Sequence, residues 1–396
     1  MSGLAGASAA ETVGNSLPAV PGPAVLVTHP IFRQPGFGRH HPLSIMRHAA
    51  ILDLCEAMGW LAPDLVRVPA LPERATLERF HTPDYLDALE AAARAMTASP
   101  EVRERYNLGT MECPLFEGLW DRARASVGGA ILAAELALQG YLAFHPGGGT
   151  HHGRPDHAAG FCYFNDPVFA ILRLLDAGLQ RVLYVDLDAH HGDGVQAAFA
   201  TDARVTLASI HEEGRWPGTG GIHDRLDGRA INIPVPRHLN DSEFLLIFRE
   251  LCRRRLEPLQ PDAIVVTCGA DALKGDPLSS MEVSNEVLGT ATQLSASLAK
   301  HAVVLGGGGY NPWTTVRMWA GLWARLSGQQ IPARLPAPAR HILAQLTCDL
   351  VDDEDRDPAW LDTLCDPLNA GPVRPRIHDL IEAALPLDPD GPGATG

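Results

Sequence analysis

The segment YVDLDAHHGDGV, residues 184–195, places three aspartates and two histidines directly behind an apolar run. An isolated buried charge costs on the order of several kcal/mol unless it is paired or bound to a metal. Alternate residues of an extended strand share a face, so Asp186, Asp188 and His190 are expected to point the same way if the extended conformation continues through them. Asp188 and His190 offer one oxygen and one nitrogen ligand, and Asp271 offers a second oxygen from a later loop. Three protein ligands with an open position form a catalytic zinc site; the alternative is a salt-bridged loop.

A second pair of histidines, His151 and His152, follows a glycine run. Asp186 and Asp193 are available to orient these rings, and a carboxylate behind a histidine fixes its tautomer and raises its basicity, as a general base requires. Tyr310 follows four consecutive glycines, where its hydroxyl can stabilise a developing oxyanion or where its ring simply packs in a loop. Two histidine pairs with matching acids favour acid–base catalysis.

Short β-rich runs alternate with helical patterns along the chain. Six runs predict strands, at residues 24–29, 141–146, 181–186, 205–210, 263–268 and 302–307. Several are continuously apolar, which is typical of parallel strands covered on both faces. The segment NDPVFAILRLLDAG predicts a helix with Asp166 as its N-cap, Pro167 in its first turn and Gly178 at its end. This alternation predicts one α/β domain with a mostly parallel sheet.

Glycine-rich segments with acids, histidines or an aromatic residue follow five of the predicted strands immediately. In open α/β sheets, ligands bind outside the carboxyl ends of the strands. The loops that carry the candidate residues are therefore expected to meet at one rim. Glycines in such loops allow the backbone to bend sharply and to approach a ligand closely.

The chain has 396 residues, of which 46% are hydrophobic, and a formal net charge of −15. This composition predicts a large core. A protein of this sign gains nothing from neutralising phosphates, which argues against nucleic-acid binding. An acidic surface attracts cationic partners such as basic peptides or polyamines. Residues 1–22 and 385–396 are small, polar and rich in Pro and Gly, so we expect flexible tails on a single domain over residues 23–384.

The cysteines and the apolar segments bear on the compartment. Seven cysteines are scattered and include no CxxC pair, so neither a disulfide framework nor a cysteine zinc site is predicted, and a reducing compartment fits. The first residues show neither the basic region nor the apolar core of a signal peptide. The stretch GGAILAAELALQGYLAF is interrupted by polar residues and predicts a buried helix running into a strand, without a membrane span. A cytoplasmic protein is expected.

Taken together, these motifs resemble the zinc-dependent histone deacetylase family, including its bacterial members related to acetoin-utilisation proteins. The resemblance runs from about His29 to Arg317 and includes, in this order, GRHHPLSIMR, FHTPDYLDAL, HHGRPDHAAGFCYFND, LYVDLDAHHGDG, WPGTG, GADALKGDP and LGGGGYN. It implies a three-layer α/β/α fold of the arginase and deacetylase type, with a central, mainly parallel sheet. It also implies hydrolysis of N-acetyl amides, typically on lysine side chains.

The resemblance also assigns roles to individual residues. It implies that Asp188, His190 and Asp271 bind one zinc ion per chain. A zinc-bound water would attack the acetyl carbonyl, His152 would accept the proton of this water, and the histidine pair would protonate the leaving amine. The residues that match the catalytic groups are the tandem His151 and His152, Asp186 and Asp193 behind them respectively, and Tyr310, which polarises the carbonyl.

A narrow tunnel for the stem of the acyl-lysine is implied as well. Phe161 and Trp216 match its aromatic walls, Gly160 lines it through its backbone, and Leu278 matches a position at the rim. Glu112, in MECP, stands where many members carry an aspartate that clamps the substrate backbone, so the geometry of that clamp is altered.

Two further positions concern the base of the pocket. Thr150 stands where eukaryotic members have an aromatic residue, which implies a wider pocket base or product-exit route. Arg47, in HPLSIMR, either supports product release or is a surface arginine.

The family also binds potassium near this site. The resemblance would place two potassium ions, largely on backbone carbonyls. The inner set is Asp186, Asp188, His190 and Ser209, and the outer set is Phe199, Asp202 and Val205.

Three other functions stay open. An arginase-type dimetal ureohydrolase shares the fold but requires an acid where this chain has Gly192. An acetylpolyamine or other small-molecule amidohydrolase would use the same machinery, although Leu278 is not the acidic gatekeeper of polyamine-selective relatives. A silent acyl-lysine-binding module would usually lack one of the catalytic groups, all of which are present. The expected partner is therefore an acetylated lysine in a peptide or protein, or a small acetylated amine, and the oligomeric state is unknown.

Overall fold

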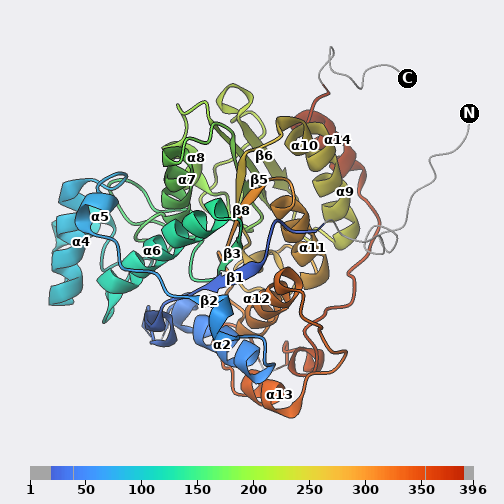
Figure 1. Cartoon of the computed structure of the whole chain (residues 1–396), viewed down its shortest axis with the longest axis horizontal. Coiled ribbons are helices and arrows are strands. Elements are labelled where there is room, and N and C mark those ends of the chain that lie inside the picture. Colours follow the sequence, from blue (N-terminus) through green and yellow to red (C-terminus); the bar gives the residue numbers. More distant parts are fainter. Residues whose placement is uncertain (1–18, 39, 353, 388–396) are drawn as a thin grey trace, which may run out of the picture.

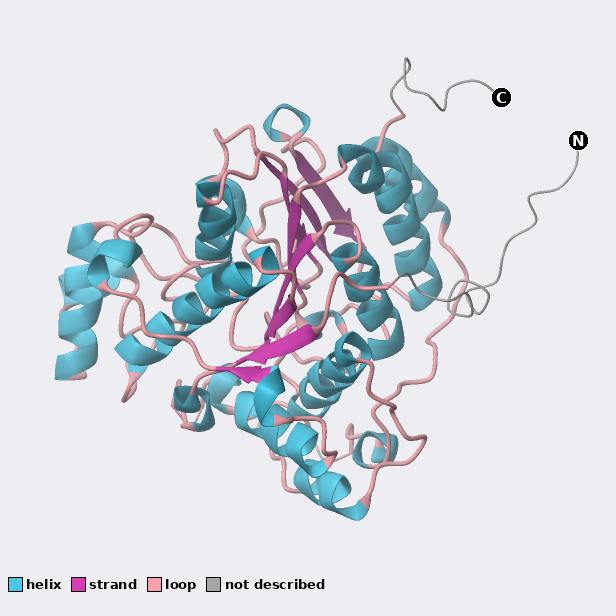
Figure 2. Cartoon of the chain, in the orientation of Figure 1, coloured by secondary structure: helices cyan, strands magenta, loops and turns pink. Residues whose placement is uncertain are grey.

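The computed structural model describes residues 19–38, 40–352 and 354–387. Within them, one parallel sheet has the strand order β2-β1-β3-β8-β7-β4-β5-β6 (Figures 1 and 2). Its strands are β1 (Ala24–Val27), β2 (Val66–Arg67), β3 (Leu142–His145), β4 (Val182–Asp186), β5 (Val205–Glu212), β6 (Ala230–Val235), β7 (Ala263–Thr267) and β8 (His301–Leu305). Every neighbouring pair is parallel, which confirms the predicted central sheet.

All six predicted strands are present, and the two strands that were not predicted lie at the edges of the sheet. Strand β2 has only two residues, too few to give a periodic pattern. Strand β6 has the sequence AINIPV, and its proline is unfavourable in a central strand. An edge strand tolerates Pro234 because one side of its backbone needs no ladder partner.

Helices cover both faces of the sheet, because successive side chains of each strand point to opposite faces. In β4, Leu183 and Val185 belong to one apolar core, and Val182 and Tyr184 belong to the other. The first core is covered by α2 (Arg47–Ala57), α9 (Asp241–Leu251), α11 (Asn285–Ala296) and α12 (Pro312–Ser327), and the second by α6 (Leu119–Leu138), α7 (Asp166–Asp176) and α8 (Asp193–Ala198). Figure 1 shows α6, α7 and α8 on one side of the sheet and α9 and α11 on the other. The expected three-layer α/β/α fold is confirmed.

Shorter elements complete the fold. The remaining α-helices are α3 (Arg74–Leu77), α4 (Pro83–Ala95), α5 (Pro100–Tyr106), α10 (Glu257–Leu259), α13 (Ala337–Ala344) and α14 (Pro375–Ala384). The 3-10 and π turns are η1 (Pro30–Arg33), η2 (Pro42–Ser44), η3 (Pro63–Leu65), η4 (Leu226–Gly228), η5 (Cys252–Leu256), η6 (Ala270–Ala272) and η7 (Pro358–Leu361). A third apolar cluster, formed by α4, α5 and part of α6, encloses Tyr163 and Phe164. It supports the loop that carries the histidine pair.

The start of α7 differs from the prediction by one residue. Asn165, and not Asp166, is the N-cap, because the Asn165 side chain accepts a hydrogen bond from the backbone N–H of Val168 at 3.3 Å. Asp166 is the first helical residue, and its carboxylate accepts from the backbone N–H groups of Gly149 at 3.0 Å and Thr150 at 2.7 Å. Its side chain therefore holds the loop in front of the histidine pair.

The long apolar stretch folds as the sequence predicts. Helix α6 occupies its first part, and β3 follows after a two-residue turn and Tyr141. None of the helices in the described ranges is long and apolar enough to cross a membrane.

The two expected tails lie largely outside the described residues. Two described residues of these predicted tails are packed, since Val20 contacts the core and Leu385 is buried in it, so the predicted tail boundaries are too wide at these positions.

Candidate active site

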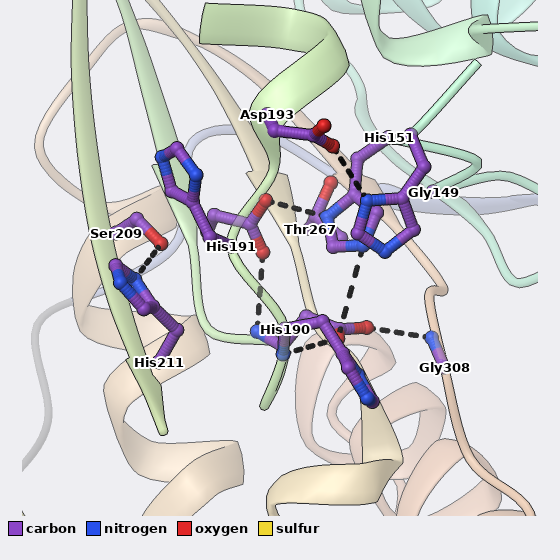
Figure 3. A network of polar contacts seen from close by, with 12 residues as sticks. Gly149, His151, His190, His191, Asp193, Ser209, His211, Thr267 and Gly308 are labelled. Atoms are coloured by element: carbon purple, nitrogen blue, oxygen red, sulfur yellow. Dashed lines mark hydrogen bonds and ion pairs between the residues drawn. The ribbon is translucent and has the colours of Figure 1, made fainter. Parts of the chain in front are cut away.

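Most of the candidate residues come from the loops that follow β3, β4, β5, β7 and β8, at the carboxyl ends of these strands, whereas Asp186 is the last residue of β4 and Glu112 lies between α5 and α6. Figure 3 shows His151, from the loop after β3, close to His190, from the loop after β4, and to Asp193, at the start of α8, with Gly308 at the edge of the same space. The parallel sheet thus brings together segments that lie more than 100 residues apart. The rim that the strand-end pattern predicted is present.

Asp188, His190 and Asp271 form a compact, buried cluster. Their ligand atoms all lie within 4.8 Å of one another, and the part of the chain that the structure describes holds no second such cluster. Nδ1 of His190 lies 3.2 Å from Oδ1 of Asp188 and 2.9 Å from Oδ2 of Asp271. Asp188 and His190 follow β4, and Asp271 lies in η6 after β7.

Backbone amides fix the orientation of both carboxylates. The N–H of Gly308 donates to Asp188 Oδ2 at 2.7 Å, and the N–H of Ala189 donates to Asp271 Oδ1 at 3.0 Å. Residue 308 must be glycine, because a Cβ there would lie 2.0 Å from Asp271 Oδ2. The backbone therefore closes tightly around two acids, each of which has one oxygen directed at Nδ1 of His190.

The charges in this cluster require a positive partner. Burial raises the pKa of Asp271, and the charge of Asp188 raises it further. Burial also opposes ionisation of Asp188, but His151 and His190 outweigh it and hold the pKa of Asp188 below its usual value. A set of two carboxylate oxygens and one imidazole nitrogen suits a divalent zinc ion, which would neutralise both acids. The donor set therefore fits zinc.

The two histidines of the tandem pair each face a carboxylate. Nδ1 of His151 donates to Oδ2 of Asp186 at 2.7 Å, and Nδ1 of His152 donates to Oδ1 of Asp193 at 2.8 Å. The ring centroids lie 4.0 Å apart, and both residues are buried. Because Nδ1 is engaged in each ring, Nε2 remains for chemistry. Nε2 of His151 lies 3.8 Å from Oδ1 of Asp188.

The two imidazoles have opposite electrostatic environments. Burial opposes the charged form of His151, but Asp186 and Asp188 outweigh it and raise its pKa to about 9. Burial and the charge of His151 lower the pKa of His152 to about 3. Asp193 counteracts this shift only in part, since it also forms an ion pair with Arg154. The pKa values of the two rings are therefore shifted in opposite directions, as an acid–base pair requires.

Tyr310 lies beside the cluster, with its ring centroid 6.4 Å from that of His190 and 5.8 Å from that of Phe161. No described residue hydrogen-bonds its hydroxyl, so this group is free to meet a ligand. Oδ2 of Asp276 accepts from the backbone N–H of Tyr310 at 2.7 Å, and Oδ1 accepts from that of Leu278 at 2.9 Å. Burial and the charge of Asp271 raise the pKa of Asp276 to about 7.

Asp276 was not singled out by sequence reasoning. It lies inside the motif GADALKGDP, which was noted for Asp271 alone. Local spacing gives no sign that its carboxylate turns back to a residue 34 positions later.

A mouth cavity of about 790 Å³ opens above the cluster. Its lining includes all five residues that were assigned to substrate binding, namely Glu112, Gly160, Phe161, Trp216 and Leu278. The indole of Trp216 is 46% exposed, and its centroid lies 4.6 Å from that of His152. An aromatic side chain is thus open to the solvent directly above the histidine pair.

Glu112 is engaged within the chain. Oε1 accepts from the backbone N–H of Gly160 at 2.5 Å, and Oε2 accepts from Nδ2 of Asn107 at 3.0 Å. Gly160 and Phe161 both have positive φ, 53° and 66°, a conformation that is costly for Phe161. The carboxylate therefore holds the strained turn that lines the mouth cavity.

A smaller cavity of about 90 Å³ lies behind the cluster. It is lined by Thr150, His151, Tyr310 and Arg47, among others. Arg47 is only 9% exposed, and its Nη1 donates to the carbonyl of Gly309 at 2.9 Å. The interpretation of Arg47 as a surface arginine is therefore wrong.

An arginase-type site requires an acidic residue at the position where this chain has Gly192. A Cβ at this position would lie 2.3 Å from Oδ2 of Asp186 and 3.2 Å from Nδ1 of His151. The pair formed by Asp186 and His151 thus fills the space that a second-metal ligand would need. This packing argues against a dimetal centre.

Comparison with known proteins gives consistent matches. The family model described as "Histone deacetylase domain" matches residues 41–326. Histone deacetylase 6 of Arabidopsis thaliana is 40% identical over 278 residues, which cover 68% of this chain and 59% of that protein. Acetoin utilization protein AcuC of Bacillus subtilis is 34% identical over 319 residues, which cover 77% of this chain and 82% of that protein.

Solved structures agree with these matches. The crystal structure of an HDAC homolog from Aquifex aeolicus superposes with a TM-score of 0.88 at 33% identity and covers 91% of this chain and 99% of that one. An HDAC homolog complexed with SAHA gives a TM-score of 0.87 at 32% identity, with the same shares of the two chains.

Proposed function

This chain belongs to the histone deacetylase family, and we propose that it is a zinc-dependent deacetylase that acts on acetylated lysine side chains in peptides or proteins. The observation that carries the proposal is the passage from the mouth cavity to the buried cluster. Phe161 and Trp216 line it at its open end, and His152 and Tyr310 line it at its inner end. A flat aromatic passage fits an extended aliphatic stem such as that of lysine.

Asp188, His190 and Asp271 would hold the zinc ion, one per chain. When bound, zinc supplies a Lewis acid that lowers the pKa of water and polarises a carbonyl. The cavities on either side of the cluster leave room for a fourth ligand, as catalytic zinc sites require.

The tandem histidines would move the protons. Neutral His152 accepts a proton at Nε2 from the attacking water, since its Nδ1 is bonded to Asp193. Protonated His151 stabilises the negative charge that develops, and the pair returns a proton to the leaving amine. Asp193 keeps the neutral ring of His152 in the tautomer that leaves Nε2 free as an acceptor, and Asp186 orients the ring of His151.

Tyr310 would donate its free hydroxyl to the oxyanion of the tetrahedral intermediate. A donor of this kind is effective when it is oriented before the reaction. Asp276 provides that orientation, because it fixes the backbone of Tyr310 and of the rim residue Leu278 with the same carboxylate.

Replacing Asp276 with asparagine should therefore reduce turnover without removing zinc. Both oxygens of Asp276 accept N–H groups, and an asparagine can accept with only one of its two terminal atoms. We expect kcat on an acetyl-lysine peptide to fall roughly 10- to 100-fold, because misplacement by about 1 Å can cost that much. KM and zinc content should change little.

A double-mutant cycle with Tyr310→Phe separates positioning from a general structural effect. If Asp276 acts through Tyr310, Asp276→Asn should cost little further activity once the hydroxyl is absent. Full additivity of the two losses would contradict the positioning role.

The proposed activity is tested by assaying the zinc-loaded chain on an acetyl-lysine peptide beside acetylputrescine and acetylspermidine, with SAHA as inhibitor. Peptide turnover that SAHA blocks supports the lysine deacetylase. Turnover of the polyamines alone would identify a small-molecule amidohydrolase with the same site. No turnover of any of the three substrates by zinc-loaded protein would contradict the proposal.

The proposal also covers the domain and its location. Residues 23–384 would form a single deacetylase domain, which is supported by one sheet and by the family match over 41–326. A cytoplasmic location is supported by the seven cysteines, all of which are free thiols.

A further inference from the structure

The turn between α8 and β5 gathers backbone carbonyls around one arginine. Nη1 of Arg229 donates to the carbonyl oxygens of Phe199 at 3.1 Å and Asp202 at 3.0 Å. Nη2 donates to the carbonyl oxygen of Ala200 at 2.6 Å. Arg229 is half-buried, and none of the carboxylates in the described residues forms an ion pair with it. The oxygens that accept hydrogen bonds from this guanidinium are therefore neutral carbonyls.

These carbonyls overlap with the outer potassium set, Phe199, Asp202 and Val205, that the family resemblance implies. Proteins bind potassium with converging carbonyl oxygens that replace its water shell. Here two of the three residues already direct their carbonyls at Arg229. The permanent charge of the guanidinium also repels a second cation in the same place. The outer set therefore does not fit a potassium ion.

We propose that Arg229 takes the place of this potassium, so that the cation of the outer site is part of the chain. The carbonyls at the C-terminal end of a helix carry partial negative charge, which a cation stabilises. Helix α8 begins at Asp193, the partner of His152, and β5 leads to the loop of Trp216. Arg229 thus ties together two elements of the active site without any ion from solution.

The inner potassium set differs from the outer set, because no cationic side chain in the described part of the chain donates to its carbonyls. Ser209 lies in register with Asp186 across β4 and β5, next to Asp188 and His190. No arginine or lysine of the described residues donates to a backbone carbonyl of these four residues. We therefore expect one potassium ion per chain, at the inner set, where the resemblance implies two. This inference concerns ion binding and does not depend on the substrate.

Crystals of the full chain soaked in Tl⁺, which replaces K⁺ and scatters anomalously, test the proposal directly. In the wild-type protein, we expect no Tl⁺ peak between the carbonyls of Phe199 and Asp202. In Arg229→Met, which removes the charge but keeps a long side chain, we expect a new peak there. A Tl⁺ ion at these carbonyls in the wild-type protein would overturn the proposal.

Thermal unfolding gives an independent readout that needs no activity. The Tm of Arg229→Met should be lower than that of the wild type in tetramethylammonium chloride, and KCl at the same ionic strength should raise it by about 2–4 °C more than it raises the wild-type Tm. Arg229→Lys, which keeps a cation, should resemble the wild type. If Arg229→Met does not fold, the wild-type Tl⁺ experiment and Arg229→Lys still decide the question.

Arg204→Met is the matched control. Arg204 lies in the same turn, but its guanidinium pairs with the carboxylate of Asp202 and with no carbonyl. Arg204→Met removes one positive charge near the same turn, but the Tm of this variant should not become more dependent on potassium. If KCl raises the Tm of Arg229→Met no more than it raises that of Arg204→Met, Arg229 is an ordinary structural side chain. The proposal that it takes the place of potassium is then wrong.

Discussion

Replacing His152 with alanine should lower kcat for an acetyl-lysine peptide by roughly 10²- to 10⁴-fold, the usual contribution of a positioned general base. His152 is buried, its Nδ1 is bonded to Asp193, and burial and the charge of His151 lower its pKa. A neutral ring with a free Nε2 is therefore present at neutral pH. Alanine removes the proton acceptor but leaves all three residues of the Asp188, His190 and Asp271 cluster in place. Zinc content and Tm should consequently change little.

His157→Ala is a suitable control for this experiment. His157 belongs to the same loop, but it is exposed and its only described side-chain partner is the neighbouring Asp156. It should retain the wild-type kcat. If His152→Ala keeps more than about a tenth of the wild-type kcat with zinc bound, another group accepts the proton and the assigned role is wrong.

Replacing Asp271 with alanine should remove the metal itself. Mutation of groups that only support a metal ligand typically costs 10- to 100-fold in affinity, so loss of a direct ligand should cost more than about 100-fold. We expect one zinc per wild-type chain after dialysis and close to none in Asp271→Ala, measured by elemental analysis. Turnover should fall with the zinc content.

Asp276→Asn is the matched comparison, because this buried aspartate lies five residues away and bonds only to backbone N–H groups. It should keep its zinc while losing turnover, whereas Asp271→Ala should lose both. Two manganese ions in the wild-type chain would instead favour the ureohydrolase, against the packing around Gly192.

The sequence by itself determined the sheet and the rim. Continuous apolar runs gave the six inner strands, because a strand covered on both faces cannot alternate. The two-residue period of a strand predicted a common side for Asp186, Asp188 and His190, but β4 ends at Asp186, and the following loop positions the other two. Ordered motifs around these residues pointed to the deacetylase family, which the family match confirms. These features are local, so that spacing along the chain is enough to predict them.

Only the tertiary structure decided which groups meet. Periodicity gives the direction of a side chain relative to its own element, but a partner is set by how distant elements pack. The carboxylate of Asp276 reaches Tyr310 across 34 residues, and that of Glu112 reaches Gly160 across 48. Arg229 reaches Phe199 in the same way, where the resemblance had implied an ion from solution. Each of these contacts depends on how the parallel strands and their loops pack in space. A local sequence pattern therefore cannot predict them.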